Sequence, residues 1–317
     1  MCVINMKKTK IFLATDVHGA EITYRKFISA VKIYRPDVAI IAGDLTGKVL
    51  VPIVKQQDGT LVAYHMEQKH VAKTKEELDE LIKKIRYAGY YPYCVTAEEM
   101  EMYKTGKLDA VAKFTELVCE VLKNWIALAE EHLKNLGVKF FMMPGNDDDY
   151  AIDEILNAND FIINPADKVM YIDELHEMMS LPYSNITPWN CPRDLPEETL
   201  RKKIDELANQ VENMGTCIFN IHVPPFRTPL DQAPLLEKDL QQKAQGVQPV
   251  GSIAVYEAIE KYQPLLSLHG HIHESRGTVK IGRTLCINPG SEYSEGILHG
   301  VLIVIEKEKV NYTFTTG

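Results

Sequence analysis

The sequence predicts an α/β fold, because short apolar runs alternate along it with helical patterns. Five runs flanked by Gly or Pro are typical of buried strands. They are residues 10–16, 37–44, 138–146, 216–222 and 264–273. Residues 20–34, between the first two runs, carry apolar side chains at helical spacing. A strand, a helix and a strand in this order favour a right-handed crossover and a largely parallel sheet.

Further helices and strands complete the prediction of mixed sheets. Two helices begin with capping boxes, in which a hydroxyl and a carboxylate satisfy free amides. These boxes are Thr74 with Glu77 and Thr96 with Glu99. Three more helices are predicted over residues 108–136, 194–214 and 252–262. The C-terminal end alternates polar and apolar residues, which is typical of antiparallel strands joined by tight turns. These strands fall within residues 278–290, 300–308 and 309–317.

Residues 48–106 interrupt this pattern, since they separate two strands that a short crossover could connect. Asp58 and Gly59, between apolar flanks, are a hairpin signal. A charged helix and a tyrosine-rich stretch follow. We predict one domain over residues 1–317 with an inserted α+β subdomain, a hairpin plus a helix, at 48–106. Its tyrosines could stack on a nucleobase, but packing in the core of the subdomain is the expected role. They are Tyr87, Tyr90, Tyr91 and Tyr93.

Composition limits the possible partners. The formal net charge of −9 offers no global attraction for nucleic acid or an anionic membrane. No window approaches the roughly 20 apolar residues of a membrane span, and the N-terminal residues lack the apolar stretch of a signal peptide. The six cysteines are scattered, as expected for reduced thiols. We expect a cytoplasmic protein with neither a membrane nor a nucleic-acid partner. The sequence carries no signal of the oligomeric state.

Side chains of metal-ligand type lie at or just beyond the ends of the five predicted strands. They are Asp16 and His18, Asp44, Asn146, His222, and His271 with His273. The carboxyl edge of the strands is where ligands bind in open α/β sheets. Imidazole and carboxylate suit Mn, Fe, Zn, Ni or Co, and one carboxylate can bridge two ions. Two cations about 3.5 to 4 Å apart can neutralise a phosphate and generate hydroxide at neutral pH.

Each of these motifs also has a plain structural interpretation. Asp16 could cap a helix, and Asp44 or Asn146 could be turn residues. His271 and His273 are more specific, because alternate residues of an extended chain point the same way and could converge on one site. Seven ligand-type residues in order at five strand ends favour metal binding over separate structural roles.

The same residues resemble the sequence blocks of the calcineurin-like metallophosphoesterases. The blocks are DVHG (16–19), GDL (43–45), GNDD (145–148), His222 with its following prolines, GHIH (270–273) and NPGS (288–291). The resemblance covers most of the chain outside the insertion. It implies a four-layer αββα sandwich of two mixed β-sheets flanked by helices. It also implies two divalent ions at the sheet edge, Mn or Fe/Zn, with Ni, Co or Mg as alternatives.

The resemblance assigns the ligands to two ions and implies a reaction. One ion would take Asp16, His18, Asp44 and His273, and the other Asp44, Asn146, His222 and His271. Asp44 would bridge them, and a metal-bridging hydroxide would hydrolyse a small or nucleotide-like phosphomonoester or phosphodiester. The alternative on the same fold is a metal-binding sensor or a catalytically weak protein-binding scaffold.

The chain departs from the family pattern at Asp147, where the family usually has a histidine that positions phosphate or protonates the leaving group. An ionised aspartate is not expected to be a strong general acid. Another histidine could supply the proton, with His269 and His299 as candidates, or the leaving group needs little help. His269 could instead point into the sheet, although its spacing from His271 places both on one face. Asp147 and His269 are the candidate catalytic residues.

Three other residues have more local predictions. Asp148 is expected to support Asn146 through a hydrogen bond. Arg227 could clamp a phosphate oxygen, although a surface arginine is the commoner outcome. Ser252 is expected to cap a helix.

Overall fold

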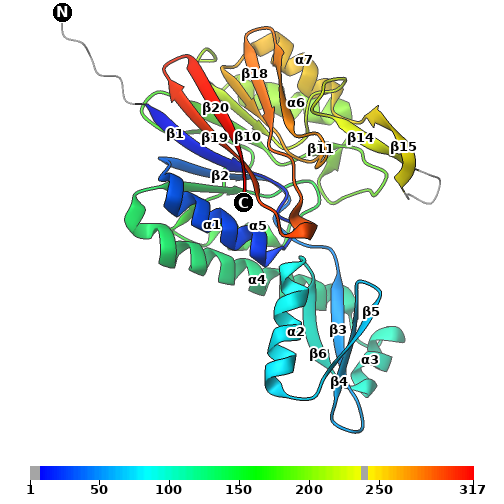
Figure 1. Cartoon of the computed structure of the whole chain (residues 1–317). Helices are drawn as coiled ribbons and strands as arrows, with labels where there is room; N and C mark the ends of the chain where they lie inside the picture. Colours follow the sequence, from blue (N-terminus) through cyan, green and yellow to red (C-terminus); the bar gives the residue numbers. More distant parts are fainter. Residues whose placement is uncertain (1–7, 237–241) are drawn as a thin grey trace, which may run out of the picture.

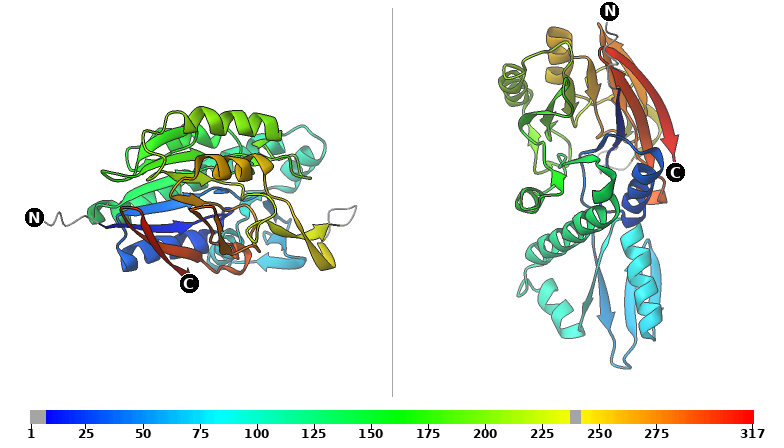
Figure 2. Two further views of the ribbon diagram at one scale, coloured as in Figure 1. Left: turned by 90° about the horizontal axis from the view of Figure 1, so that it is seen from above. Right: turned by 90° about the vertical axis from the view of Figure 1, so that its left-hand side faces the viewer.

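Two six-stranded β-sheets lie face to face at the centre of the computed structural model, which describes residues 8–236 and 242–317 (Figure 1). Apolar side chains of both sheets, among them Leu13, Phe141, Met178 and Leu268, form the core between them. Two further cores lie on the outer faces, where helices cover each sheet (Figure 2). The predicted four-layer αββα sandwich is therefore confirmed.

The first sheet has the order β20-β19-β1-β2-β7-β8. Its strands are β1 (Thr9–Ala14), β2 (Val38–Ala42), β7 (Lys139–Met143), β8 (Ile162–Ile163), β19 (His299–Glu306) and β20 (Lys309–Thr316). Within this sheet β1, β2, β7 and β8 run parallel to one another. At one edge β19 pairs antiparallel with β1, and β20 pairs antiparallel with β19. The carboxyl ends of β1, β2 and β7 therefore meet at one edge.

The second sheet has the order β17-β18-β16-β13-β10-β9. Its strands are β9 (Lys168–Tyr171), β10 (Glu177–Leu181), β13 (Ile218–Ile221), β16 (Leu266–Leu268), β17 (Gly277–Ile281) and β18 (Thr284–Asn288). The four central strands are parallel, and the two outer strands are antiparallel to their neighbours. Both sheets are mixed, as predicted.

The helices bury one apolar stripe each against the sheets. The first sheet is covered by α1 (Glu21–Tyr34), α4 (Ala110–Leu133) and α5 (Ile152–Asn157), and the second by α6 (Glu197–Ala208) and α7 (Ile253–Tyr262). The predicted helix over residues 194–214 is too long, because Asp194 belongs to a short strand and Pro196 precedes the first turn of α6. Ser252 caps α7 as predicted, since its hydroxyl accepts from Val255 N.

The insertion projects away from the sandwich (Figure 1). It forms a sheet of order β5-β4-β3-β6 with its own small core. Its elements are β3 (Leu50–Lys55), β4 (Leu61–His65), β5 (Gln68–Ala72), α2 (Lys75–Tyr87), β6 (Tyr91–Val95) and α3 (Ala97–Lys104). The hairpin at Asp58 and both capping boxes are confirmed. The predicted hairpin and helices are joined by two further strands, β5 and β6, and we interpret the whole unit as an inserted subdomain.

Tyr91 departs from the expected packing of the tyrosines. It belongs to the core beneath the first sheet, 2% exposed, and its ring meets the edge of Phe114 of α4. Its hydroxyl accepts a hydrogen bond from Gly47 N. Tyr90 packs on the small core of the insertion.

Two findings bear on the expected environment. Among the described helices, none is long and apolar enough to span a membrane. The five cysteines within the described residues are free thiols.

Replacing Phe27 of α1 by alanine is expected to lower the free energy of unfolding by about 3 to 5 kcal/mol, because it leaves a cavity between helix and sheet. Phe27 is fully buried and packs on Phe12 and Phe140. Ile33 of the same helix is 75% exposed, so Ile33→Ala should stay within about 0.5 kcal/mol. Urea unfolding followed by circular dichroism measures both; equal losses would contradict the packing assignment.

Candidate metal centre

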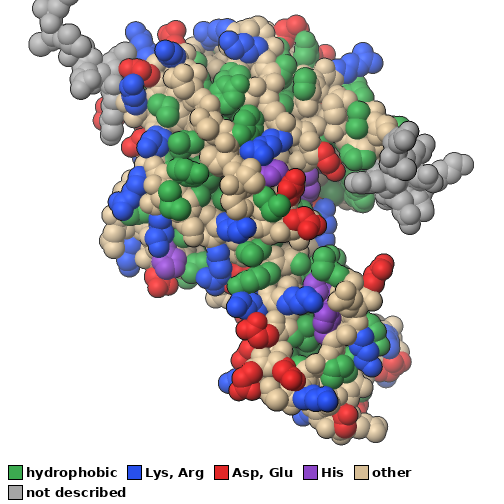
Figure 3. Space-filling view, in the orientation of Figure 1, with side chains coloured by type: hydrophobic (Ala, Val, Ile, Leu, Met, Phe, Trp, Pro, Cys, Tyr) green, Lys and Arg blue, Asp and Glu red, His purple; other side chains and the backbone are tan. Residues whose placement is uncertain are grey.

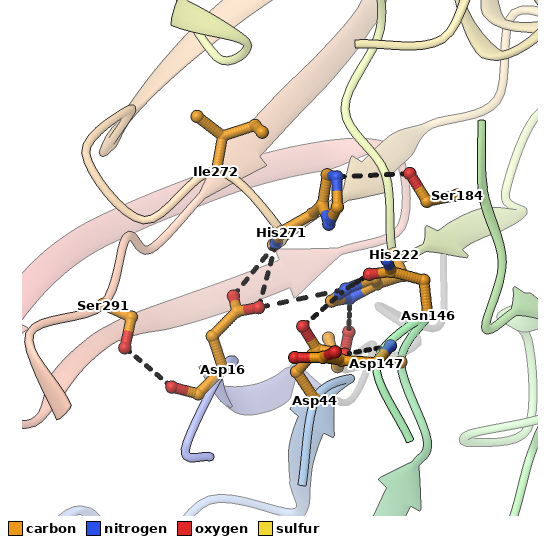
Figure 4. A network of polar contacts seen from close by, with 12 residues as sticks. Asp16, Asp44, Asn146, Asp147, Ser184, His222, His271, Ile272 and Ser291 are labelled. Atoms are coloured by element: carbon orange, nitrogen blue, oxygen red, sulfur yellow. Dashed lines mark hydrogen bonds and ion pairs between the residues drawn. The ribbon is translucent and has the colours of Figure 1, made fainter. Parts of the chain in front are cut away.

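The seven predicted ligand residues meet at the shared carboxyl edge of the two sheets. Asp16, His18, Asp44 and Asn146 follow strands of the first sheet; His222, His271 and His273 follow strands of the second. The side chains of Asp16, Asp44 and Asn146 point toward the His222 ring (Figure 4). Five of the seven are buried, and His271 and His273 are partly exposed.

One group of ligand atoms comprises Asp16, His18 and His273, with one atom of each within 4.8 Å of the others. The Nε2 atoms of His18 and His273 are 3.1 Å apart. Asp16 Oδ1 lies 3.6 Å from His273 Nε2. Two imidazole nitrogens and a carboxylate oxygen thus converge on one point.

A second group comprises Asp44, His222 and His271, again with ligand atoms within 4.8 Å. Asn146 Oδ1 joins it at 3.1 Å from His222 Nε2. Asp44 Oδ2 lies 3.4 Å from His222 Nε2 and 3.5 Å from His18 Nε2. The Asp44 carboxylate therefore lies between the two groups.

The route by which the two C-terminal histidines reach the site differs from the prediction. The strand β16 ends at Leu268, and His271 has a positive φ of 66°. The argument from alternation along an extended chain was therefore wrong. The two histidines still reach the same site, where His273 lies in the first group and His271 in the second.

Buried carboxylates dominate the electrostatics of the centre. Burial alone would raise the pKa values of Asp16 and Asp44, but neighbouring imidazoles lower both. Burial alone would lower the pKa of His222, yet Asp44 and Asp16 raise it to about 9. A proton on His222 thus supplies positive charge where the carboxylates need it. Divalent cations would meet the same need, and the N and O donors suit them.

The backbone at the ligands is unusual. Asp16, His18, Asp44 and His271 all have positive φ, between 40° and 66°. Such a conformation costs a non-glycine residue on the order of 1 to 3 kcal/mol and is found mostly at functional sites. Gly43 precedes Asp44 at φ 124°, and a Cβ there would lie 2.1 Å from His222 Nδ1. Only glycine lets the β2 loop approach this ring.

Hydrogen bonds fix the orientation of the ligands. His222 Nδ1 lies 3.0 Å from the Ala42 carbonyl, to which it donates, so Nε2 faces Asp44 and Asn146. His271 Nε2 lies 3.2 Å from Ser184 Oγ.

Asp194, which the sequence did not single out, orients Asn146. Its Oδ1 accepts a hydrogen bond of 2.9 Å from Asn146 Nδ2, so the Asn146 oxygen faces the centre. The expected contact from Asp148 was wrong. Asp148 is fully buried and accepts hydrogen bonds from the amides of Leu45, Thr46 and Gly145, and thereby ties the loops after β2 and β7 together.

Arg193 anchors the loop after β7, which carries Asn146. Its side chain is 2% exposed, and its guanidinium donates to the carbonyl of Asp148 at 2.8 Å and to the carboxylate of Asp153 at 2.7 Å. Its backbone amide donates to the carbonyl of Asn146 at 3.0 Å. A single arginine 47 positions after Asn146 carries no motif, so no sequence signal could have identified it.

Asp147, at the position of the family's usual histidine, forms an ion pair with Lys48. Asp147 Oδ2 is 3.7 Å from His18 Nδ1, and its other oxygen accepts from Cys191 Sγ at 3.4 Å. Burial and Asp44 raise the pKa of this carboxyl against the opposing effect of Lys48. Burial lowers and Asp147 raises the pKa of Lys48, with a net increase, so the ammonium stays charged at neutral pH.

The two alternative histidines are placed differently. His269 is fully buried, and its Nδ1 faces the carbonyls of Ile221 and Val223 at 2.9 and 3.0 Å. Burial lowers its pKa to about 4, so the ring is neutral and carries no acidic proton at neutral pH. His299 lies on β19, 3.5 Å from the carboxylate of Glu292. Arg227 lies over the Phe226 ring.

A pocket of about 470 Å³ opens over the ligand groups. Its described lining includes five of the ligand-type residues, the pair Lys48 and Asp147, and a neutral wall from residues 185–189, 191, 233–234, 248 and 250. Tyr293 packs from another side, with its ring centroid 4.6 Å from that of His18.

The comparisons with known proteins concern mainly the fold. An uncharacterized protein of Methanocaldococcus jannaschii is 35% identical over 150 residues, which are 46% of this chain and 62% of that protein. The match thus spans less than two thirds of that relative. The protein TT1561 of Thermus thermophilus superposes with a TM-score of 0.50 at 11% identity, over 97% of this chain and 99% of that one. Another solved structure reaches 0.54 at 14% identity, with the same coverage. No family model matches the chain.

The layers, the strand order and the ligand groups at the shared edge agree with the resemblance found in the sequence. Over nearly its whole length the chain shares its fold with these two solved structures. The four layers that the resemblance implied are present, and all the ligand-type residues of its sequence blocks lie at one site.

Replacing Asp194 by asparagine is expected to weaken divalent-metal binding by roughly 10- to 100-fold, as loss of an orienting partner does. An amide there places a donor either against Asn146 Nδ2 or against the amides of Thr187 and Cys191. Calorimetric titration of metal-free protein with Mn²⁺ measures the effect. Asp160→Asn, at an exposed carboxylate, is the control, and equal affinities for both variants would refute the role of Asp194.

Proposed function

We propose that the protein is a metal-dependent hydrolase of phosphate esters, acting on a phosphomonoester or phosphodiester of small or nucleotide-like size. The observation that supports it is the position of Asp44 Oδ2, within 3.5 Å of a histidine nitrogen from each ligand group. Two divalent ions, Mn or Fe/Zn, would neutralise phosphate charge and lower the pKa of a water there. Asp16, His18 and His273 would hold one ion, and Asn146, His222 and His271 the other, with Asp44 shared.

Other residues of the chain keep the proposed metal ligands in a fixed orientation. The hydrogen bonds to Ala42 and Ser184 keep His222 and His271 in one orientation. Asp148 holds the two ligand-bearing loops at a fixed separation. Such preorganisation is what catalysis by positioning and electrostatics requires.

Lys48 takes over the task of the missing histidine in this proposal. Its ammonium lines the pocket beside the ligand groups, and Asp147 fixes its position. A charged donor there can stabilise the negative charge that develops on a leaving oxygen. His269 is fully buried and is not among the described residues that line the pocket, and burial lowers its pKa to about 4. Asp147 then acts as a positioning residue and not as the general acid.

The proposed partners and compartment follow from the amino-acid composition. The acidic net charge disfavours nucleic acid as a partner, and the scattered thiols fit a reducing compartment, for which we propose the cytoplasm.

Hydrolysis of bis-p-nitrophenyl phosphate and p-nitrophenyl phosphate after reconstitution with Mn²⁺ tests the function. Turnover is expected, and it should vanish with EDTA and fall by roughly a hundredfold or more in Asp44→Asn, since that carboxylate serves both ions. Asp160→Asn should retain activity. Two bound ions per chain without any turnover would refute the hydrolase and favour a metal-binding sensor or scaffold.

Replacing Lys48 by methionine tests its role through the leaving group. For an ester of p-nitrophenol, whose oxygen leaves easily, the rate should change little; for the matching phenyl ester it should fall by roughly a hundredfold. Lys55→Met, at an exposed lysine of β3, is the control. Equal losses on both esters would mean that Lys48 only maintains the structure.

A further inference from the structure

The neutral wall of the pocket carries two large apolar side chains that face solvent. Trp189 is 59% exposed and Ile186 is 54% exposed, and both line the pocket that contains the metal-ligand residues. The indole has no hydrogen bond and no aromatic neighbour among the described residues. Exposed apolar side chains grouped at a pocket mark a binding surface. The surface is hollowed where the insertion leaves the sandwich (Figure 3).

The segment that carries Trp189 is held in place by the residue that orients the metal ligand. Asp194 Oδ2 accepts hydrogen bonds from Thr187 N at 2.9 Å, Thr187 Oγ1 at 2.5 Å and Cys191 N at 3.0 Å. Its other oxygen accepts from Asn146 Nδ2 at 2.9 Å. One carboxylate therefore fixes the indole-bearing turn relative to the proposed metal site.

Two further contacts make this turn rigid. Asn190 has φ 49°, and its amide donates to the Thr187 carbonyl at 3.2 Å, which closes the turn around Trp189. Asn185 Nδ2 donates to the Val250 carbonyl at 3.2 Å, just beyond the hairpin of β14 (Gln232–Leu236) and β15 (Gln242–Pro249). A wall fixed from both sides costs little entropy when a ligand binds.

The charges of the pocket limit what lies against this wall. Apart from histidines, the one cation among the described lining residues is Lys48, which the proposed function already assigns to the leaving oxygen. Glu274, which is also among the lining residues, is an acid. The pocket therefore provides for one phosphate at the metal-ligand residues and offers no second cationic position for another phosphoryl group.

We propose that Trp189, with Ile186 beside it, stacks on a flat, uncharged ring of the substrate, of which a nucleobase is the commonest biological form. The substrate class is then an ester with a single phosphate and such a ring. This inference rests on the proposed function, because it uses the same pocket. A volume of about 470 Å³ accommodates a ring together with a sugar and a phosphate.

Tryptophan fluorescence tests the stacking without any turnover. The chain has two tryptophans, and Trp125 is 4% exposed, so a solvent-facing ligand reports on Trp189. With Mg²⁺ present, AMP is expected to quench the emission saturably, and ribose 5-phosphate, which lacks the base, is not. Trp189→Phe should abolish the signal. Equal effects of both ligands, or none from AMP, would overturn the proposal.

Two esters with the same leaving group provide the kinetic test. For thymidine 5′-(p-nitrophenyl phosphate), Trp189→Ala should lower kcat/KM by roughly 5- to 150-fold, the usual worth of one stacked base. For ethyl p-nitrophenyl phosphate the change should stay within about twofold. Tyr64→Ala, at a 69% exposed tyrosine of the insertion, is the control. Equal losses on both esters would overturn the proposal.

The two proposals fail in distinguishable ways. Metal-dependent turnover of both esters without AMP quenching would refute the ring site and leave the hydrolase. Quenching by AMP, lost in Trp189→Phe, in a protein that hydrolyses neither ester would refute the hydrolase and leave the ring site.

Discussion

Buried negative charge is the constraint on which the rest of the structure depends. Asp16 and Asp44 are almost completely buried, and a buried carboxylate is costly unless it is paired. The two sheets meet this requirement jointly, since the first supplies both carboxylates and the second supplies His222 on the opposite side. Neither sheet alone could form the centre. The core between the sheets therefore does more than stabilise the fold, because it sets the distance across which these charges interact.

The second constraint is the close approach of the ligand-bearing loops to one another. It explains why strained backbone conformations are concentrated at the centre. A Cβ at Gly145 would lie 2.1 Å from Asp44 Oδ1, and one at Gly270 would lie 2.0 Å from Thr15 Oγ1. Ligand-bearing loops from different strands thus pass at backbone distance. Asp16 and Asp44 adopt positive φ to turn their carboxylates inward. Regular strands immediately before each loop supply the packing that offsets this strain.

The sequence predicted the parts of this arrangement that are local. Strand runs, capping boxes and the ligand types at strand ends follow from residue period and from the topology of parallel sheets. Contacts between distant loops could not be predicted from the sequence. Asn146 and its partner Asp194 are 48 positions apart, and Lys48 meets Asp147 across the whole insertion. The prediction from alternation failed at His271, because the chain leaves the strand before the histidines begin.

The contact between Lys48 and Asp147 also shows how the insertion is connected to the chemistry. The insertion begins directly after the loop that bears Asp44, and Gly47 N donates to the hydroxyl of Tyr91, which is buried in the main core. The start of β6 therefore fixes the backbone at Gly47, next to Lys48. The positive charge beside position 147 comes from another segment of the chain, since Lys48 forms the ion pair with Asp147. The position of that charge relative to the ligand-type residues therefore depends on how the start of the insertion is anchored.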